Sequence, residues 1–206
     1  MQDGTKQYLE TITWLSKLYN YMNDTLFKSE LKRPVITVQA DEKDRAYGWF
    51  TLRRVWKDGA EDEGEFEINM SAQYLNRPVK QIASTLIHEM CHQFAQAHNV
   101  QDCSRSGTYH NKLFKKFAEE HGLSVEKVER SGWSRTTLTD ETAELLGFFL
   151  EKFPPTLIYR EQLNKDIRVN TSSTRKYLCR CCGASVRATR SVNIMCADCN
   201  EFMEVV

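Results

Sequence analysis

The run His88-Glu89-Met90-Cys91-His92 lies in the middle of a strongly amphipathic segment, and this combination constrains the fold more than any other feature. The segment's apolar residues recur at helical spacing: Val79, Ile82, Ala83, Leu86, Ile87, Met90, Cys91 and Phe94. This spacing predicts a buried helix that is capped by Asn76 and has Pro78 near its first turn. A buried helix needs other elements to cover it, so the chain must fold around this one.

Two histidines one turn apart on this helix form a candidate metal site. His88 and His92 project from one face about 6 Å apart, so both imidazoles can reach one Zn2+ at about 2.0–2.1 Å. Glu89 follows the first histidine and is placed to take a proton from an attacking water. The pattern therefore indicates a zinc protease. The alternative is a surface helix with two solvated histidines and a salt-bridged glutamate.

A catalytic zinc needs a third protein ligand, because one position stays open for water. His110 is the best candidate, since it shares a face with Leu113, Phe114 and Phe117 of a helix predicted over 108–121. A histidine there is poised to point at a neighbouring helix. A core histidine bonded to a carbonyl is the alternative.

The other candidates for the third ligand are weaker. His98 has the metzincin spacing, but Ala95 favours a continuing helix, which turns His98 about 240° away from His92. His121 lies beside a predicted helix end, where an imidazolium would complement the helix dipole. The two carboxylate candidates fit exposed ion pairs: Glu119 and Glu120 with Lys115 and Lys116.

The remaining elements are predicted to be short and mixed in type. Helical spacing is found over 8–27 and 139–152, and β-rich runs over 35–38, 47–56 and 66–70. No apolar run approaches the about 20 residues of a membrane-spanning helix, and the N-terminus shows no secretory signal. We therefore expect a cytoplasmic protein that does not bind membranes, with association with a nucleoid or chromatin left open. We also expect a monomer.

Four cysteines near the C-terminus form a zinc-ribbon pattern. Cys179-x2-Cys182 and Cys196-x2-Cys199 are two knuckles that can close one tetrahedral site of four thiolates. Such a site is structural, and the segments 184–190 and 192–195 between the knuckles are predicted to pair as a hairpin.

The chain has seven cysteines, an odd number that argues against a secreted disulfide framework. Cys181 is surplus to the ribbon, and a register shifted by one residue stays open. A redox disulfide is the alternative use of the cluster. The sequence assigns no role to Cys91 or Cys103.

Charge points to a partner only locally, because 28 Lys and Arg balance 28 Asp and Glu. One basic group has no acidic residue among its members and can bind DNA phosphates, single-stranded DNA included. This group is Arg175, Lys176, Arg180, Arg187 and Arg190. A solvated face of the ribbon would have the same composition.

A second basic group is interleaved with aromatic residues that could stack on single-stranded bases. It comprises Lys43, Arg45, Arg53, Arg54 and Lys57, with Tyr47, Trp49, Phe50 and Trp56. Alternating aromatic residues in strands more often pack a core.

Several separated motifs carry a family resemblance. In chain order they are Leu18 with 23-NDTLF-27, 46-AYGWF-50, 68-INMS-71, Arg77-Pro78, 85-TLIHEMCH-92, and His110 in a His-x3-Phe setting. Over about residues 8–135 the chain resembles the SprT-like family, which includes the Spartan proteases. Many members carry a similar ribbon.

The resemblance implies an α+β fold: a zincin-like domain of helices packed on a small, mostly antiparallel sheet, followed by the ribbon. It implies a zinc endopeptidase with His88, His92 and His110 on the metal and Glu89 in catalysis. In eukaryotic relatives the activity is DNA-dependent cleavage of proteins crosslinked to DNA.

The sequence thus predicts three segments: a metalloprotease domain (1–153), a connector (154–176) and a zinc ribbon (177–206). One catalytic and one structural Zn2+ are expected, with a protein or peptide as substrate. The alternative function is a non-catalytic DNA-binding accessory protein with structural metal sites. Glu89 argues against it, because a structural site has no use for that carboxylate.

Overall fold

The N-terminal helix begins earlier than its apolar spacing predicted. Helix α1 spans Gly4–Leu26, because the side chain of Asp3 accepts a hydrogen bond from the Thr5 N–H and caps the first turn. It ends before Lys28 and Ser29, both of which have positive φ. The buried residues of α1 lie between Thr11 and Asn23.

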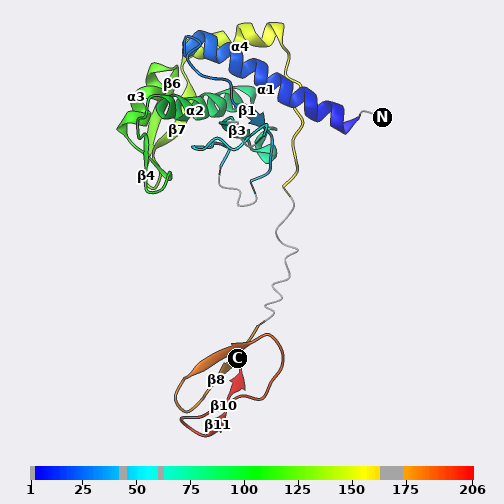
Figure 1. Ribbon diagram of the computed structural model, residues 1–206, viewed down its shortest axis with the longest axis vertical. Coiled ribbons are helices and arrows are strands. Elements are labelled where there is room, and N and C mark those ends of the chain that lie inside the picture. The colour runs from blue at the N-terminus through cyan, green and yellow to red at the C-terminus, as the bar shows by residue number, and fades with distance from the viewer. Residues whose placement is uncertain (1–2, 42–45, 60–62, 163–173) are drawn as a thin grey trace. The chain divides into compact units, whose positions relative to one another are not determined.

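The computed structural model describes four stretches of the chain: residues 3–41, 46–59, 63–162 and 174–206. The chain divides into two units, residues 1–162 and 163–206. The first unit holds all four α-helices of the described residues, and the second holds only short strands (Figure 1). None of the described helices is both long and apolar enough to cross a membrane.

Helix α2 spans Val79–Ala97 and is the centre of the first unit. It contacts the three other helices, α1, α3 (Lys112–Glu120) and α4 (Asp140–Lys152). The predicted cap at Asn76 is wrong. The helix starts directly after Pro78, whose fixed φ suits the start of a helix, and no side chain caps it.

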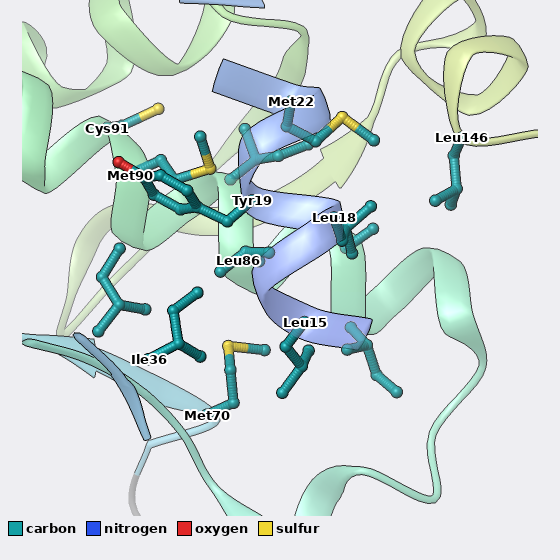
Figure 2. Close-up of a cluster of buried hydrophobic side chains, with 14 of the residues drawn as sticks. Leu15, Leu18, Tyr19, Met22, Ile36, Met70, Leu86, Met90, Cys91 and Leu146 are labelled. Carbon is teal, nitrogen blue, oxygen red and sulfur yellow. The ribbon is translucent and has the colours of Figure 1, made fainter. Parts of the chain in front are cut away.

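The core is built mainly between α1 and α2. Figure 2 shows Leu15, Leu18 and Met22 of α1 in one cluster with Leu86 and Met90 of α2. All five side chains are fully buried. This packing fixes the orientation of α2 and therefore of the histidines on its other face.

Two small sheets flank α2. The first has the order β1–β3–β2 and consists of β1 (Val35–Thr37), β2 (Gly48–Phe50) and β3 (Glu67–Met70). Strands β1 and β3 are parallel, and β2 pairs antiparallel with β3. The strand predicted over 47–56 is thus shorter, with a further bridge from Trp56 to Glu65.

The second sheet contains a hairpin of β6 and β7 that was not predicted. Its order is β4–β5–β7–β6, with β4 (Cys103–Ser104), β5 (Tyr109–His110), β6 (Leu123–Val128) and β7 (Gly132–Leu138). Only the β5–β7 pair is parallel, and it joins His110 to Gly132. Helices and small sheets together make the predicted α+β class.

The described part of the second unit, residues 174–206, is built from five short strands. Strand β8 (Arg175–Leu178) pairs antiparallel with β9 (Ser185–Ala188) and β12 (Glu204–Val205), and β10 (Met195–Cys196) pairs with β11 (Glu201–Phe202). The predicted hairpin between 184–190 and 192–195 is wrong, because β9 pairs with β8 instead. Strand β8 supplies a longer partner with four paired residues.

The predicted connector differs from the structure at both ends. Residues up to 162 lie against the first unit: the Thr11 hydroxyl donates to Thr156 O (2.9 Å), and Arg160 N donates to Ala72 O (3.0 Å). At the other end, Arg175 and Lys176 belong to β8. Residues 163–173 of the connector lie outside the described residues.

Candidate metal centre and active site

Three histidines from two elements meet at one point. His88 and His92 lie one turn apart on α2, and His110 lies on β5. The Nε2 atom of His110 is 3.1 Å from that of His88 and 3.2 Å from that of His92. A tetrahedral Zn2+ with bonds of about 2.0–2.1 Å would place ligand nitrogens about 3.3–3.4 Å apart. The spacing of the three nitrogens therefore fits a zinc ion.

His110 lies beside His88 and His92 for a reason other than the predicted one. The helix predicted over 108–121 begins only at Lys112, because the Asn111 side chain accepts hydrogen bonds from the Leu113 and Phe114 N–H groups and caps it. His110 is therefore on a strand, not on a helix face. Its position is fixed by the pairing of β5 with β7.

Glycine at position 132 permits that pairing. Gly132 has φ +72°, and a Cβ built on it would lie 2.2 Å from the backbone oxygen of His110. A larger residue would both strain the backbone and push β5 away from β7. The close approach of β7 to His110 thus depends on this glycine.

The hydrogen bonds of His92 and His110 fix which ring nitrogen faces the centre. His92 Nδ1 is 2.5 Å from an Asp102 carboxylate oxygen, and His110 Nδ1 is 3.2 Å from the Ser131 carbonyl oxygen. Both oxygens can only accept, so each Nδ1 carries the proton. In the neutral rings the Nε2 lone pairs then point into the centre, as metal ligation requires.

The hairpin of β6 and β7, which includes Ser131, also orients His88. The Nδ1 atom of His88 lies 3.2 Å from the Thr136 hydroxyl on β7, and the Ser84 hydroxyl donates to the Thr136 backbone oxygen at 3.0 Å. All three rings are thus held by a second partner. Lone pairs this close repel one another unless a cation lies between them.

The pKa values of the three histidines differ sharply. Burial lowers the pKa of His88 well below its usual value and, with the nearby His92, lowers the pKa of His110 to about 4. Burial also opposes a charge on His92, but hydrogen bonds to Asp102 and Cys103, together with the negative charges of Glu89 and Asp102, outweigh it and raise the pKa of His92 to about 10. Burial thus favours the neutral form of His88 and His110, the form in which an imidazole binds a metal.

Glu89 lies next to this cluster in a largely apolar setting. Its side chain is only 6% exposed, and burial raises its pKa to about 7. The backbone N–H of Phe50 donates a hydrogen bond to its carboxylate. A carboxyl group with a pKa near neutrality can both accept and return a proton.

Strand β2 brings its backbone close to α2. A Cβ on Gly48 would lie 2.8 Å from the Asn69 oxygen and 3.1 Å from the Thr85 methyl group. The absence of a side chain at Gly48 therefore permits the strand to approach Glu89. Among the described residues, β2 is also one of the two edge strands of its sheet.

A cleft of about 1120 Å3 contains these groups. It is lined by β2, by the outer face of α2, by β7 and by the loop that precedes β5. His88, Glu89, His92 and His110 all lie on its wall. The cleft is therefore large enough for an extended polypeptide segment to reach the histidines.

Asp102 is the main residue that the sequence prediction missed. It is 7% exposed and bonds to His92 from a loop ten residues further along the chain. Ser131 and Thr136 were missed as well, because no prediction covered their hairpin. The sequence contains no hydrophobic periodicity that would identify Asp102 in this loop as a partner of His92.

Cys103 also lies near this site and lines the cleft. His92, Asp102 and Cys103 could form a second ligand set, with donor atoms within 4.8 Å of one another. However, the nitrogen of His92 that faces this set is already bonded to Asp102. The three-histidine set therefore remains the better candidate centre.

The weaker candidates lie outside the cluster. Helix α2 continues through Ala95 as predicted, and His98 Nδ1 donates to Phe94 O at 2.9 Å. His121 is the C-cap residue of α3, as its predicted place at a helix end implies. Burial lowers its pKa, and its ring stacks on Phe27 at 4.2 Å. The predicted pairs are present, Lys115–Glu119 at 3.5 Å and Lys116–Glu120 at 3.8 Å.

The basic and aromatic group near β2 is largely occupied with internal contacts. Arg54 stacks on Phe66 at 4.9 Å and donates to Gly64 O at 2.9 Å. The Trp56 indole donates to Glu67 at 2.6 Å. Lys43 and Arg45 lie outside the described residues. These contacts favour the structural interpretation of this group.

Removing Asp102 should weaken metal binding without removing a ligand. Asp102→Ala leaves His92 without the acceptor that orients its ring, and loss of such a partner lowers metal affinity about 10- to 100-fold. Zinc titration against a competing chelator measures the change. Asp102→Asn is the control, because its amide oxygen can still accept from Nδ1. Unchanged affinity in Asp102→Ala would contradict the orienting role.

The four ribbon cysteines also converge. The sulfur atoms of Cys179, Cys182, Cys196 and Cys199 lie within 4.8 Å of one another, with Cys182 and Cys196 3.6 Å apart. Four tetrahedral Zn–S bonds of about 2.3 Å would place sulfurs about 3.8 Å apart. This cluster fits a closed structural zinc site, and Cys181 is not a member of it.

The two knuckles have matching backbone geometry. Gly183 N donates to Cys179 O (2.9 Å), and Asn200 N donates to Cys196 O (2.8 Å). Gly183 and Asn200 both have positive φ. Hydrogen bonds from backbone N–H groups, that of Cys182 foremost, lower the pKa of Cys179 to about 7, which favours the thiolate that metals bind.

Breaking one knuckle should affect the second unit alone. Cys182→Ser removes a thiolate, so we expect the ribbon to lose its zinc and its fold. The first unit has its own core and should keep its melting temperature. Calorimetry with zinc analysis checks this. A loss of cooperative melting throughout the chain would show that the two units depend on each other.

Comparison with known proteins assigns the chain that carries this site to a protein family. The model of the SprT-like family matches residues 15–132, more than half of the 206 residues. The match includes all of α2 and extends past His110. Comparisons with curated proteins and with solved structures gave no match. The chain therefore belongs to the SprT-like family and carries a metalloprotease-type domain.

Proposed function

We propose that this protein is a zinc-dependent endopeptidase that cleaves DNA-associated or DNA-crosslinked proteins. The observation that carries the proposal is the convergence of three histidine nitrogens beside a buried glutamate in an open cleft. A purely structural metal site would not need the carboxylate of Glu89. Membership of a metalloprotease-type family supports the same conclusion.

His88, His92 and His110 would hold the zinc. When bound, zinc supplies Lewis acidity that activates water and polarises a peptide carbonyl. Glu89 accepts the proton of the attacking water and returns it to the leaving amine. The Phe50 N–H bond orients the Glu89 carboxylate for both transfers.

The free edge of β2 offers a place for the substrate backbone. Ser71 N donates to Tyr47 O and Thr51 N donates to Glu67 O, so residues 47, 49 and 51 direct their peptide groups toward β3. Alternation then turns the peptide groups of Gly48 and Phe50 toward the cleft. The Phe50 N–H is bonded to Glu89, so an extended substrate can pair with the peptide groups of Gly48 and the carbonyl of Phe50 as an added antiparallel strand.

The ribbon supports the DNA part of the proposal. Its five basic residues, Arg175, Lys176, Arg180, Arg187 and Arg190, are all exposed. Lys176 lies directly opposite Arg187 in the β8–β9 pair, and like charges in that arrangement repel. Of these five, only Arg180 pairs with an acidic residue in the part of the chain that the structure describes, Glu204 at 2.8 Å. A phosphate between Lys176 and Arg187 would relieve the repulsion.

Cleavage of casein and histone by the zinc-loaded full chain tests the proposal. We expect cleavage that a chelator abolishes and zinc restores. Histone cleavage should increase with single-stranded DNA, and Lys176→Glu/Arg187→Glu should remove that increase while casein cleavage persists. An absence of cleavage under all these conditions would favour the non-catalytic alternative.

A further inference from the structure

Arg77 is held rigidly on the wall of the cleft. Its Nε donates to Tyr74 O at 2.9 Å, and its Nη2 lies 3.1 Å from the Thr85 hydroxyl. The guanidinium carbon lies 4.0 Å from the centre of the Tyr47 ring. These contacts fix the plane of the guanidinium group before any ligand binds.

This cation has no acidic partner among the described residues. The hydrogen bonds to Tyr74 and Thr85 use two of its five N–H donors, so three stay uncommitted. Arg77 is half-buried, and burial lowers its pKa. A carboxylate is a favourable ligand for an arginine in this setting, because its two oxygens can accept two parallel hydrogen bonds from the planar guanidinium group.

Two measures place Arg77 near the reacting bond. Thr85 precedes Glu89 by one turn of α2, about 6 Å along the helix axis. In the segment of β2, Phe50 contacts Glu89, and Tyr47, directly before the strand, contacts Arg77. These two contact points are three residues apart, about 10 Å along an extended chain. A substrate strand antiparallel to β2 would bring a residue on the C-terminal side of the scissile bond to Arg77.

We propose that Arg77 forms a carboxylate-binding subsite that selects substrates with an acidic group two or three residues after the scissile bond. The inference rests on the proposed function, because it names the substrate class of the same cleft. The carboxylate can come from an Asp or Glu side chain or from a free C-terminus. A purely structural Arg77 would only join β2 to α2 and would favour no substrate.

Peptide binding to the zinc-loaded Glu89→Gln full chain separates these roles without cleavage. The probes are two fluorescein-labelled, C-terminally amidated peptides that differ only in one Glu or Gln. We expect the Glu peptide to bind about 10-fold more tightly than the Gln peptide, because only the Glu carboxylate can form a charge-assisted hydrogen bond with Arg77. A third peptide, with Gln and a free C-terminus, tells the two carboxylate sources apart.

Adding Arg77→Gln should abolish this preference, and Arg77→Lys should keep a smaller one because it retains the charge but not the fork. Arg135→Gln is the matched control, since Arg135 lines the cleft but is exposed and pairs with Glu126 at 3.4 Å. It should leave the preference unchanged. The lysine variant decides the matter if the glutamine variant does not fold.

The proposed subsite would be contradicted if the protein bound the Glu and Gln peptides with equal affinity. It would also be contradicted if Arg77→Gln weakened the binding of both peptides by the same factor. Binding of a single-stranded oligonucleotide that depends on Arg77, with no preference between the peptides, would instead identify a phosphate site. If the preference is present but the wild type cleaves neither peptide, the proposed function fails and the subsite stands.

Discussion

Replacing His110 with alanine is expected to release the zinc of the candidate active site and to abolish cleavage, while the chain stays folded. The variant removes the Nε2 atom that lies 3.1 Å from that of His88 and 3.2 Å from that of His92. The core of α1 and α2 does not include this residue, so circular dichroism and melting should change little. Zinc content should fall from about two ions per chain to about one, held by the ribbon.

His98→Ala and His121→Ala are the matched controls, because each removes an imidazole outside the cluster. Both variants should keep their full zinc content. Zinc retained by His110→Ala but lost from His98→Ala would mean that the chain ligates the metal in another way.

His110 lies beside His88 and His92 as predicted, but on strand β5 and not on the predicted helix. The apolar spacing of Leu113, Phe114 and Phe117 predicted a helix that already included His110. The signal that corrects this is Asn111, a favourable cap whose side chain accepts two N–H bonds of the first turn. Placed before the cap, His110 could have been assigned to the preceding strand.

The buried helix and the cysteine knuckles were predictable because their signals are local. An apolar stripe at 3.6-residue spacing and two C-x2-C pairs need no knowledge of the rest of the chain. The contact of Asp102 with His92 is tertiary, as is the approach of Gly132 to His110. Such contacts become visible only when β5 and β7 are paired.

The hairpin of β6 and β7 escaped prediction because its strands are mostly polar. Strand β6 buries Leu123 at its start, but most of its following residues are exposed or half-exposed. The hairpin nevertheless supplies the partners of two site histidines, through Ser131 and Thr136. Its role is to orient ligands, which a hydrophobic pattern does not report.

Glu89→Gln is expected to keep both zinc ions and the fold but to lose about 10²–10⁴-fold in the cleavage rate, the range typical of general acid–base groups. Glutamine has nearly the same shape and can still accept the Phe50 N–H bond. It cannot accept the proton of the attacking water. Equal melting temperatures of the two proteins would show that the loss is chemical.

The most direct test of the account is casein cleavage by the zinc-loaded wild type and Glu89→Gln, side by side, with zinc measured in both samples. The account predicts cleavage by the wild type and almost none by the variant at equal zinc content. A fully active, zinc-replete Glu89→Gln protein would contradict it.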